Sequence, residues 1–144
     1  MTRLARDDGS TMPLTIFFGF LSLVLILLVV SATSLYLERK RLFTLADGAA
    51  LVGAESFDLD DVELTAAGYR PTLETADVAA AVSAYLSSTP SADFTGLEVE
   101  RAETVDGRSA TVSLSAYWTP PVLSLLVPDG LRIEVTAVAR SVFS

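Results

Sequence analysis

An unbroken apolar run, MPLTIFFGFLSLVLILLVVSATSLYL, extends from Met12 to Leu37 near the start of the chain. A bilayer core about 30 Å thick needs roughly 20 apolar helical residues, so the run is long enough to span a membrane. It ends at the charged residues 38–41 (ERKR), whereas a cleaved signal peptide has a shorter apolar core and a small-residue exit. A buried helix of a soluble protein is disfavoured because the run has no polar face. We therefore predict a membrane-spanning helix at 12–37, preceded by a short leader at 1–11.

Helical periodicity continues beyond the charged residues, through 38–56. Apolar residues recur there at spacings of three and four, which places on one helical face Leu42, Leu45, Ala49 and Val52. A helix from Pro13 to Ser56 would be about 65 Å long at roughly 1.5 Å per residue. We expect its lower half to lie in lipid and its upper half to cover a domain.

A second stripe on this helix consists of small residues, Ala46, Ala50 and Ala54 at i, i+4 and i+8. Small stripes let another backbone approach closely, although alanine is also simply a good helix former. Gly53 lies beside the stripe, and a glycine costs roughly 1 kcal/mol in a helix interior, a cost that close packing would explain. Together with the neighbouring Asp47, we predict these residues to form a helix-packing interface: Ala46, Asp47, Ala50, Gly53 and Ala54.

The remaining chain, 57–144, predicts a small acidic α+β domain. Residues 57–71 form a connector with room for a short helical turn. Residues 74–88 predict a short helix with Thr75 as its N-cap, and the expected buried face consists of Val78, Val82, Tyr85 and Leu86.

Alternating apolar and polar residues predict three strands in the second half of the chain. In the first, Leu97, Val99 and Arg101 should share one face, opposite to Glu98, Glu100 and Ala102. The dipeptide Asp106-Gly107 predicts a type I′ turn. The inward residues of the next strand should be Ala110, Val112, Leu114 and Ala116. The third strand covers 131–142, with inward-facing Ile133, Val135, and Ala137 or Val138.

A three-stranded sheet cannot cover its own apolar face. The upper half of the long helix and the short helix are the available covers. We therefore predict an α+β fold of pilin-like design, in which a membrane helix continues into a small antiparallel sheet. A short apolar run at 122–127 should tuck against the domain or reach the membrane surface.

Charge and composition exclude several classes of function. The net charge is −8, and residues 55–106 hold twelve acidic side chains against Arg70 and Arg101. This argues against nucleic acid as a partner and against a domain lying flat on anionic lipid. The chain has no cysteine and no histidine, which excludes disulfides, thiolate catalysis and imidazole chemistry.

The acidic residues 58–61 (DLDD) are the only cluster that suggests metal or acid–base chemistry. They lack the glycine and the final glutamate of a helix–loop–helix calcium site. The pair Asp58 and Asp60 would need a dry pocket to separate their pKa values, and a polar connector offers none. We therefore predict no catalytic, metal or cofactor-binding residues, no cofactor and no small-molecule substrate.

The helix beyond the membrane resembles the signature of the Tad/Flp pilus-assembly TadE/TadG-like family. The residues that fit that pattern are Arg39, Leu42, Ala46, Asp47, Ala49, Ala50, Leu51, Gly53 and Ala54. The leader at 6–10 (RDDGS) and the ending, with a Thr-Pro-Pro break before a strand that contains 135–139 (VTAVA), are also similar to the family. Gly9 is not followed by the glutamate of a prepilin cleavage site, which favours the uncleaved, TadG-like side of the family.

The resemblance implies a non-enzymatic accessory protein of pilus assembly or related secretion, with the cytoplasmic membrane and pilus or secretion-apparatus proteins as partners. It also implies a cytoplasmic N-terminus and an extracytoplasmic domain. The basic residues flanking the span, Arg3 and Arg6 against 39–41, do not decide the orientation. Asp47 would either pair with a basic group on a neighbouring helix or be solvated. The alternative function is a membrane-anchored sensor or ligand-binding module.

Overall fold

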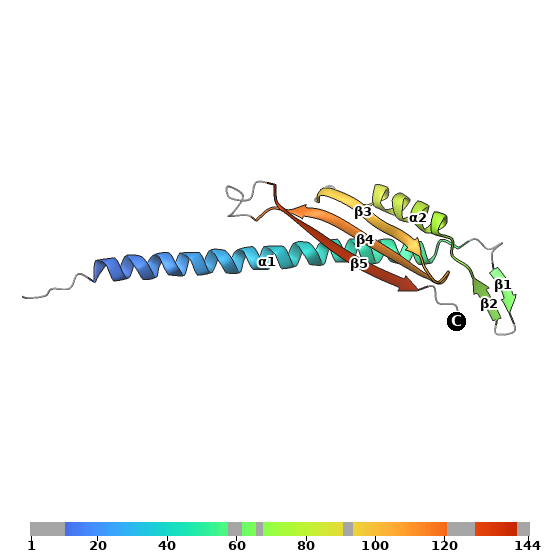
Figure 1. Ribbon diagram of the computed structural model, residues 1–144, viewed down its shortest axis with the longest axis horizontal. Coiled ribbons are helices and arrows are strands. Elements are labelled where there is room, and N and C mark those ends of the chain that lie inside the picture. Colours follow the sequence, from blue (N-terminus) through green and yellow to red (C-terminus); the bar gives the residue numbers. More distant parts are fainter. Residues whose placement is uncertain (1–10, 58–61, 66–67, 91–93, 121–128, 141–144) are drawn as a thin grey trace, which may run out of the picture.

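The computed structural model describes residues 11–57, 62–65, 68–90, 94–120 and 129–140. In these ranges the elements are α1 (Met12–Ala54), β1 (Val62–Thr65), β2 (Gly68–Pro71), α2 (Thr75–Ser88), β3 (Thr95–Thr104), β4 (Ser109–Trp118) and β5 (Leu131–Arg140). The predicted α+β class is confirmed by one long apolar helix, one short helix and a three-stranded antiparallel sheet (Figure 1). The predicted leader up to residue 10, the acidic cluster 58–61 and the apolar run 122–127 lie outside the described residues.

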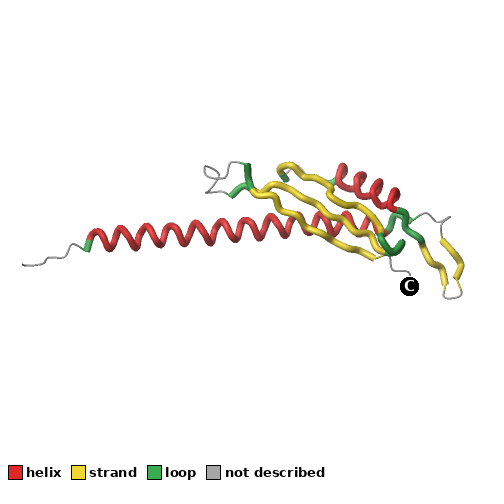
Figure 2. Tube along the Cα trace, viewed as in Figure 1, coloured by secondary structure: helices red, strands yellow, loops and turns green. Residues whose placement is uncertain are grey.

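Helix α1 is continuous over 43 residues, about 65 Å at 1.5 Å per residue. Its N-terminal half extends away from the rest of the protein, as Figure 2 shows, and its most apolar 18-residue stretch is entirely unburied. The hydroxyls of Thr15, Ser22 and Thr33 donate to backbone carbonyls four residues earlier. These bonds satisfy polar groups that lipid cannot solvate. The unburied half of α1 is therefore suited to cross a membrane.

The second half of α1 and the whole of α2 cover one face of the β3–β4–β5 sheet (Figure 1). Every second residue of β4 points into this core, as predicted, and is buried: Ala110, Val112, Leu114 and Ala116. Val135 and Ala137 of β5 are buried beside them, whereas Val138 is 61% exposed. Ala137, not Val138, is therefore the inward residue of β5.

Strand β4 runs antiparallel to α1. Near the C-terminal end of α1, a Cβ added at Gly53 would lie 3.2 Å from the Cβ of Ala110. At the other end of β4, the indole Nε1–H of Trp118 donates to Ser34 Oγ at 3.3 Å. The two contacts are about 28 Å apart along the helix and about 27 Å apart along the strand. The agreement means that β4 runs alongside the helix from one contact to the other.

Helix α2 occurs where predicted, with its buried face on Val78 and Val82. Its predicted N-cap is wrong: Glu74 holds that position, without a side-chain capping bond. The Thr75 hydroxyl instead donates to the Thr104 carbonyl at 3.4 Å, which ties the start of α2 to the end of β3. A hydroxyl that reaches a neighbouring strand is unavailable to the helix's own N–H groups.

The connector at 57–71, which had room for a short helical turn, contains a hairpin instead. Strands β1 and β2 pair antiparallel, with Val62 opposite Pro71 and Thr65 opposite Gly68. The pair forms a separate two-stranded sheet. Four-residue strands are too short for alternation to be recognised, and backbone pairing decides the conformation instead.

Strand β3 departs from simple alternation because its register with β4 shifts between Val99 and Arg101. Such a bulge adds one residue and places two consecutive side chains on the same face. Ala102 therefore lines a groove under α2 together with Leu97 and Val99. The predicted grouping, with Arg101 beside Leu97 and Ala102 opposite, is wrong beyond the bulge.

The β3–β4 hairpin is confirmed, but its turn is not type I′. That type needs positive φ at both central residues, and in the described chain only glycines have positive φ, with Gly107 at +65°. The turn is held by Asp106, whose Oδ1 accepts the N–H groups of Arg108 at 2.9 Å and Ser109 at 2.7 Å. These bonds hold the pKa of Asp106 below its ordinary value.

The outer face of the sheet carries a polar network centred on Arg132. Its guanidinium donates to Glu98 at 3.1 Å, to Ser115 Oγ at 3.0 Å, and to Glu100. The Ser115 hydroxyl donates to Glu100 at 2.6 Å. The pKa of Glu100 lies below its ordinary value. The largest cause is the hydrogen bond from the Ser115 hydroxyl, and the next is the bond from Arg132; a smaller desolvation effect raises the pKa. This network joins all three strands across the face that no helix covers.

The network predicts a dependence of stability on acid. The pKa of Glu100 is lower in the folded protein than in the unfolded chain, where it is about 4.5. Its contribution to the free energy of unfolding is therefore present above the unfolded pKa and is lost as pH falls through the folded pKa. Glu100→Gln should lower the urea midpoint of the detergent-solubilised protein at pH 7 and have a smaller effect near about pH 3. Ser115→Ala should act in the same direction. An equal effect of Glu100→Gln at both pH values would contradict this account.

Candidate interaction site

The predicted interface residues lie on the part of α1 that carries the domain. Ala46 and Ala50 are fully buried, and Ala54 is almost so. They belong to the same core as α2, β4 and β5, all of which pack against α1. The small stripe is therefore used within the chain, where it lets the protein's own sheet and helix approach the spine closely.

Gly53 is a position of close approach in this packing. A Cβ there would lie 3.1 Å from Val78 Cγ1, 3.2 Å from Ala110 Cβ and 3.4 Å from Val82 Cγ2. Contacts of this length are tighter than most real Cβ contacts. The missing side chain therefore lets α1, α2 and β4 meet at one point, which explains a glycine in a helix interior.

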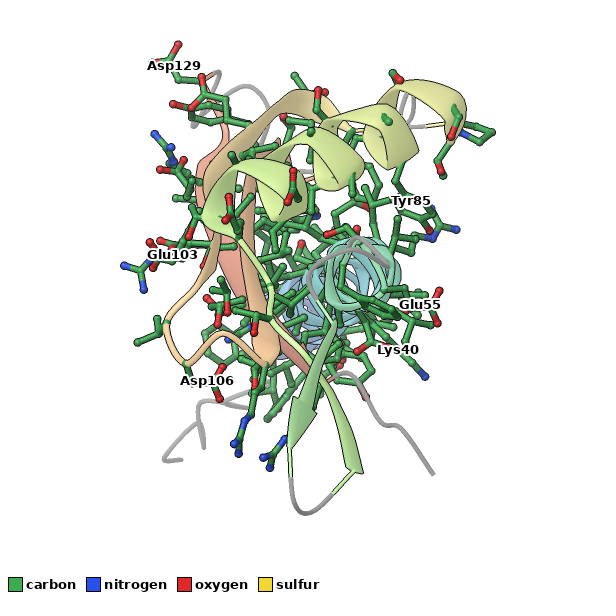
Figure 3. All side chains as sticks on the ribbon, turned by 90° about the vertical axis from the view of Figure 1, so that its right-hand side faces the viewer. Lys40, Glu55, Tyr85, Glu103, Asp106 and Asp129 are labelled. Atoms are coloured by element: carbon green, nitrogen blue, oxygen red, sulfur yellow. The ribbon has the colours of Figure 1, made fainter. Side chains whose placement is uncertain are left out.

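Asp47 differs from the other four predicted residues, because it is exposed. On a helix, residues four apart share a face, and Phe43 and Leu51 on either side of Asp47 are 47% and 53% exposed. Lys40 lies on the same side, and Figure 3 shows it on the side of α1 away from α2; with Phe43 it also lines a groove beside β5. We call the set Lys40, Phe43, Asp47 and Leu51 the outward face of α1.

The structure thus divides the predicted interface into two parts. Four residues are buried in the chain's own domain, and only Asp47 is accessible to another molecule. The prediction from small residues did not include Phe43 and Leu51. Their spacing of i, i+4 and i+8 with Asp47 was a signal in the sequence that would have identified them.

A groove of about 640 Å³ lies between α1 and β5, just above the membrane-spanning run. From α1 it is lined by Tyr36, Arg39, Lys40 and Phe43, and from β5 by residues 134–136. It is an open groove that mixes aromatic and basic side chains. Such a mixture is typical of the membrane–water boundary, where amphipathic rings and cations meet lipid headgroups.

Catalytic chemistry has little support in this geometry. Among the described residues there is no group of three or more acidic side chains placed to hold a metal ion. Asp58 and Asp60, the carboxylate pair considered for acid–base chemistry, lie outside the described residues. Glu100 is engaged by Ser115 and Arg132 on an exposed sheet face, and such a pair ties strands together.

The packing at Gly53 makes a stability prediction. Gly53→Leu should overpack the junction of α1, α2 and β4. The free energy of unfolding should fall by about 1–3 kcal/mol. Denaturant unfolding in detergent, followed by the emission of the single tryptophan, measures this. Leu51→Ala, two residues away on the outward face, is the matched control and should change stability by less than about 0.5 kcal/mol. Equal effects of the two substitutions would show that the junction is loosely packed.

Comparison with known proteins identifies the same segment of the chain. The Tad family model, described as Flp pilus-assembly TadE/G-like, matches residues 9–56, about a third of the chain. No curated protein and no solved structure matches. The matched region is α1 and the residues beside it, so it includes both the unburied span and the part that carries the domain. The family is generally non-enzymatic, and the match confirms the resemblance seen in the helix signature. Residues 9–56 are therefore similar to the TadE/G-like Flp pilus-assembly family, and they contain a helix that is long and apolar enough to cross a membrane once.

Proposed function

We propose that this protein is a non-enzymatic, membrane-anchored accessory protein of Tad/Flp-type pilus assembly or related secretion. One observation carries the proposal: the family segment is a single helix that is unburied in its lower half and is the core of a folded domain in its upper half. Such a helix couples whatever it contacts in the membrane to whatever the domain contacts outside it.

We infer that the N-terminus is cytoplasmic and that the domain, residues 57–144, is extracytoplasmic. Pilus partners act outside the membrane, and the family relationship supports this orientation. Long domains translocate largely regardless of their charge, so the basic residues at 39–41 do not oppose it. The acidic surface of the domain is also compatible with an exported protein.

Two kinds of helix packing would serve this function. Ala46, Ala50, Gly53 and Ala54 pack the domain rigidly onto the spine. Asp47, with its apolar neighbours Phe43 and Leu51, is proposed to meet a pilus or secretion-apparatus protein. No basic residue lies three or four positions from Asp47 on α1, so a cation on a partner helix would give it an ion pair that its own helix does not offer.

Complementation of a deletion strain tests the function. Loss of the gene should reduce surface pili at least about tenfold, and the wild-type gene should restore them. Asp47→Lys should restore few pili at a normal protein level, because like charges would then meet at the proposed contact. Glu55→Lys is the matched control: it makes the same change at an exposed position two turns higher and should restore piliation. Pili are counted by electron microscopy, and protein level is measured by immunoblot.

Separate outcomes address the separate parts of the proposal. Normal piliation in the deletion strain would reject the function. Full activity of Asp47→Lys would reject only the role of the outward face. A reporter fused after Ser144 should be active outside the cytoplasm, and a cytoplasmic signal would reject the orientation and with it the pilus role.

A further inference from the structure

The lower end of the sheet reaches the membrane-spanning part of α1. We call Tyr117, Trp118 and Leu131, three residues at this end, the foot of the sheet. Tyr117 and Trp118 end β4, and Leu131 begins β5 directly opposite Trp118. The bond from Trp118 Nε1 to Ser34 Oγ anchors the foot to α1. Ser34 lies inside the uncharged run, three residues before its end at Leu37.

The length of the uncharged run sets the depth of this contact. The 26 residues from Met12 to Leu37 form about 39 Å of helix, roughly 9 Å more than a hydrocarbon core of about 30 Å. If the excess lies entirely at the domain end, Ser34 lies in the headgroup layer, which is about 5–7 Å thick on each side. If the excess lies at the other end, Ser34 lies within hydrocarbon. Both limits place the Trp118 contact inside the membrane.

The chemistry of the foot suits the headgroup layer. Tryptophan and tyrosine are enriched there, since one end of each ring is apolar and the other is polar. Tyr117 is 39% exposed and Leu131 49% exposed, and Tyr36 of α1, 66% exposed, lies on the helix just above Ser34. Three large apolar or aromatic side chains thus remain open to their surroundings at one level.

Two charged residues limit how deep the foot can lie. Asp129 precedes Leu131 and is exposed, and Arg132 follows it. A charge in the hydrocarbon core is costly, whereas the headgroup layer solvates it. The foot therefore fits the headgroup layer better than the hydrocarbon below it.

We propose that the foot of the sheet rests in the headgroup layer of the bilayer that α1 spans. The domain then has two membrane contacts, the helix and the foot, which are joined through the Trp118–Ser34 bond. The foot fixes how deep α1 lies and which side of the helix the domain occupies relative to the membrane plane. This inference does not depend on the pilus role or on the orientation of the chain.

The only tryptophan of the chain is Trp118, so its emission reports on the foot without any added probe. The full chain is reconstituted in phosphatidylcholine vesicles that contain lipids brominated near the top or near the end of the acyl chain. Bromines near the top should quench Trp118 at least about twice as strongly as bromines near the chain end, because the headgroup layer lies closer to the former.

The control moves the tryptophan to the other end of the same hairpin. In Trp118→Phe/Val105→Trp the probe occupies the β3–β4 turn, where Val105 is 85% exposed. That turn adjoins Ala110, which contacts the helix about 28 Å above Ser34. Both brominated lipids should leave this variant unquenched, and circular dichroism checks that it is folded.

Two results would overturn the proposal. Quenching of Trp118 no stronger than in the control would place the foot above the membrane. Stronger quenching by bromines near the chain end would also contradict it, by placing the foot in hydrocarbon.

Discussion

The structure depends on the continuity of α1 across the membrane boundary. A helix in lipid has no hydrophobic gain from burying one face, because lipid tails are as apolar as leucine. Above the boundary the same helix needs one apolar face for the sheet and a polar or partly polar face for water. The chain meets both requirements in one unbroken helix, since the change from all-round apolar to one-sided occurs at the charged residues 38–41. No flexible linker separates anchor and domain.

The close fit between helix and sheet follows from small residues at the contact. Ala46, Ala49, Ala50 and Gly53 are buried, and together they bring the backbone of α1 close to β4 and α2. Larger side chains would move the sheet outward and open voids beside Leu42 and Leu114, which are fully buried. Close packing over the full length of β4 makes the domain and the upper helix one body. A displacement of the anchor in the membrane would then be transmitted to the domain.

Much of this arrangement could be predicted from the sequence, because long periodic segments carry strong signals. The span, the continuation of the helix, the β3–β4 hairpin and the buried residues of α2 all followed from periodicity. The bulge between Val99 and Arg101 could not, since a register shift depends on pairing with another strand and leaves no local pattern in β3. The β1–β2 hairpin is too short to leave a pattern.

The interface was predicted only in part, for a physical reason. A stripe of small residues indicates that some backbone approaches closely, but it does not indicate whose backbone. Gly53 and the alanines meet the chain's own α2 and β4, and only Asp47 remains exposed. The bond between Trp118 and Ser34, 84 residues apart, likewise depends on tertiary structure that no local pattern reports.

Charge completes the account of how the domain stands on the membrane. The stretch 55–106 carries twelve acidic residues against two basic ones, and anionic headgroups repel such a surface. At the lower end the charges are mixed, because basic residues 39–41 are accompanied by the exposed acidic residues Glu98 and Asp129. Charge therefore argues against a domain that lies flat, but it does not by itself attract the lower end to lipid. The half-exposed ring of Tyr117 is the uncharged group at that end that suits a membrane boundary.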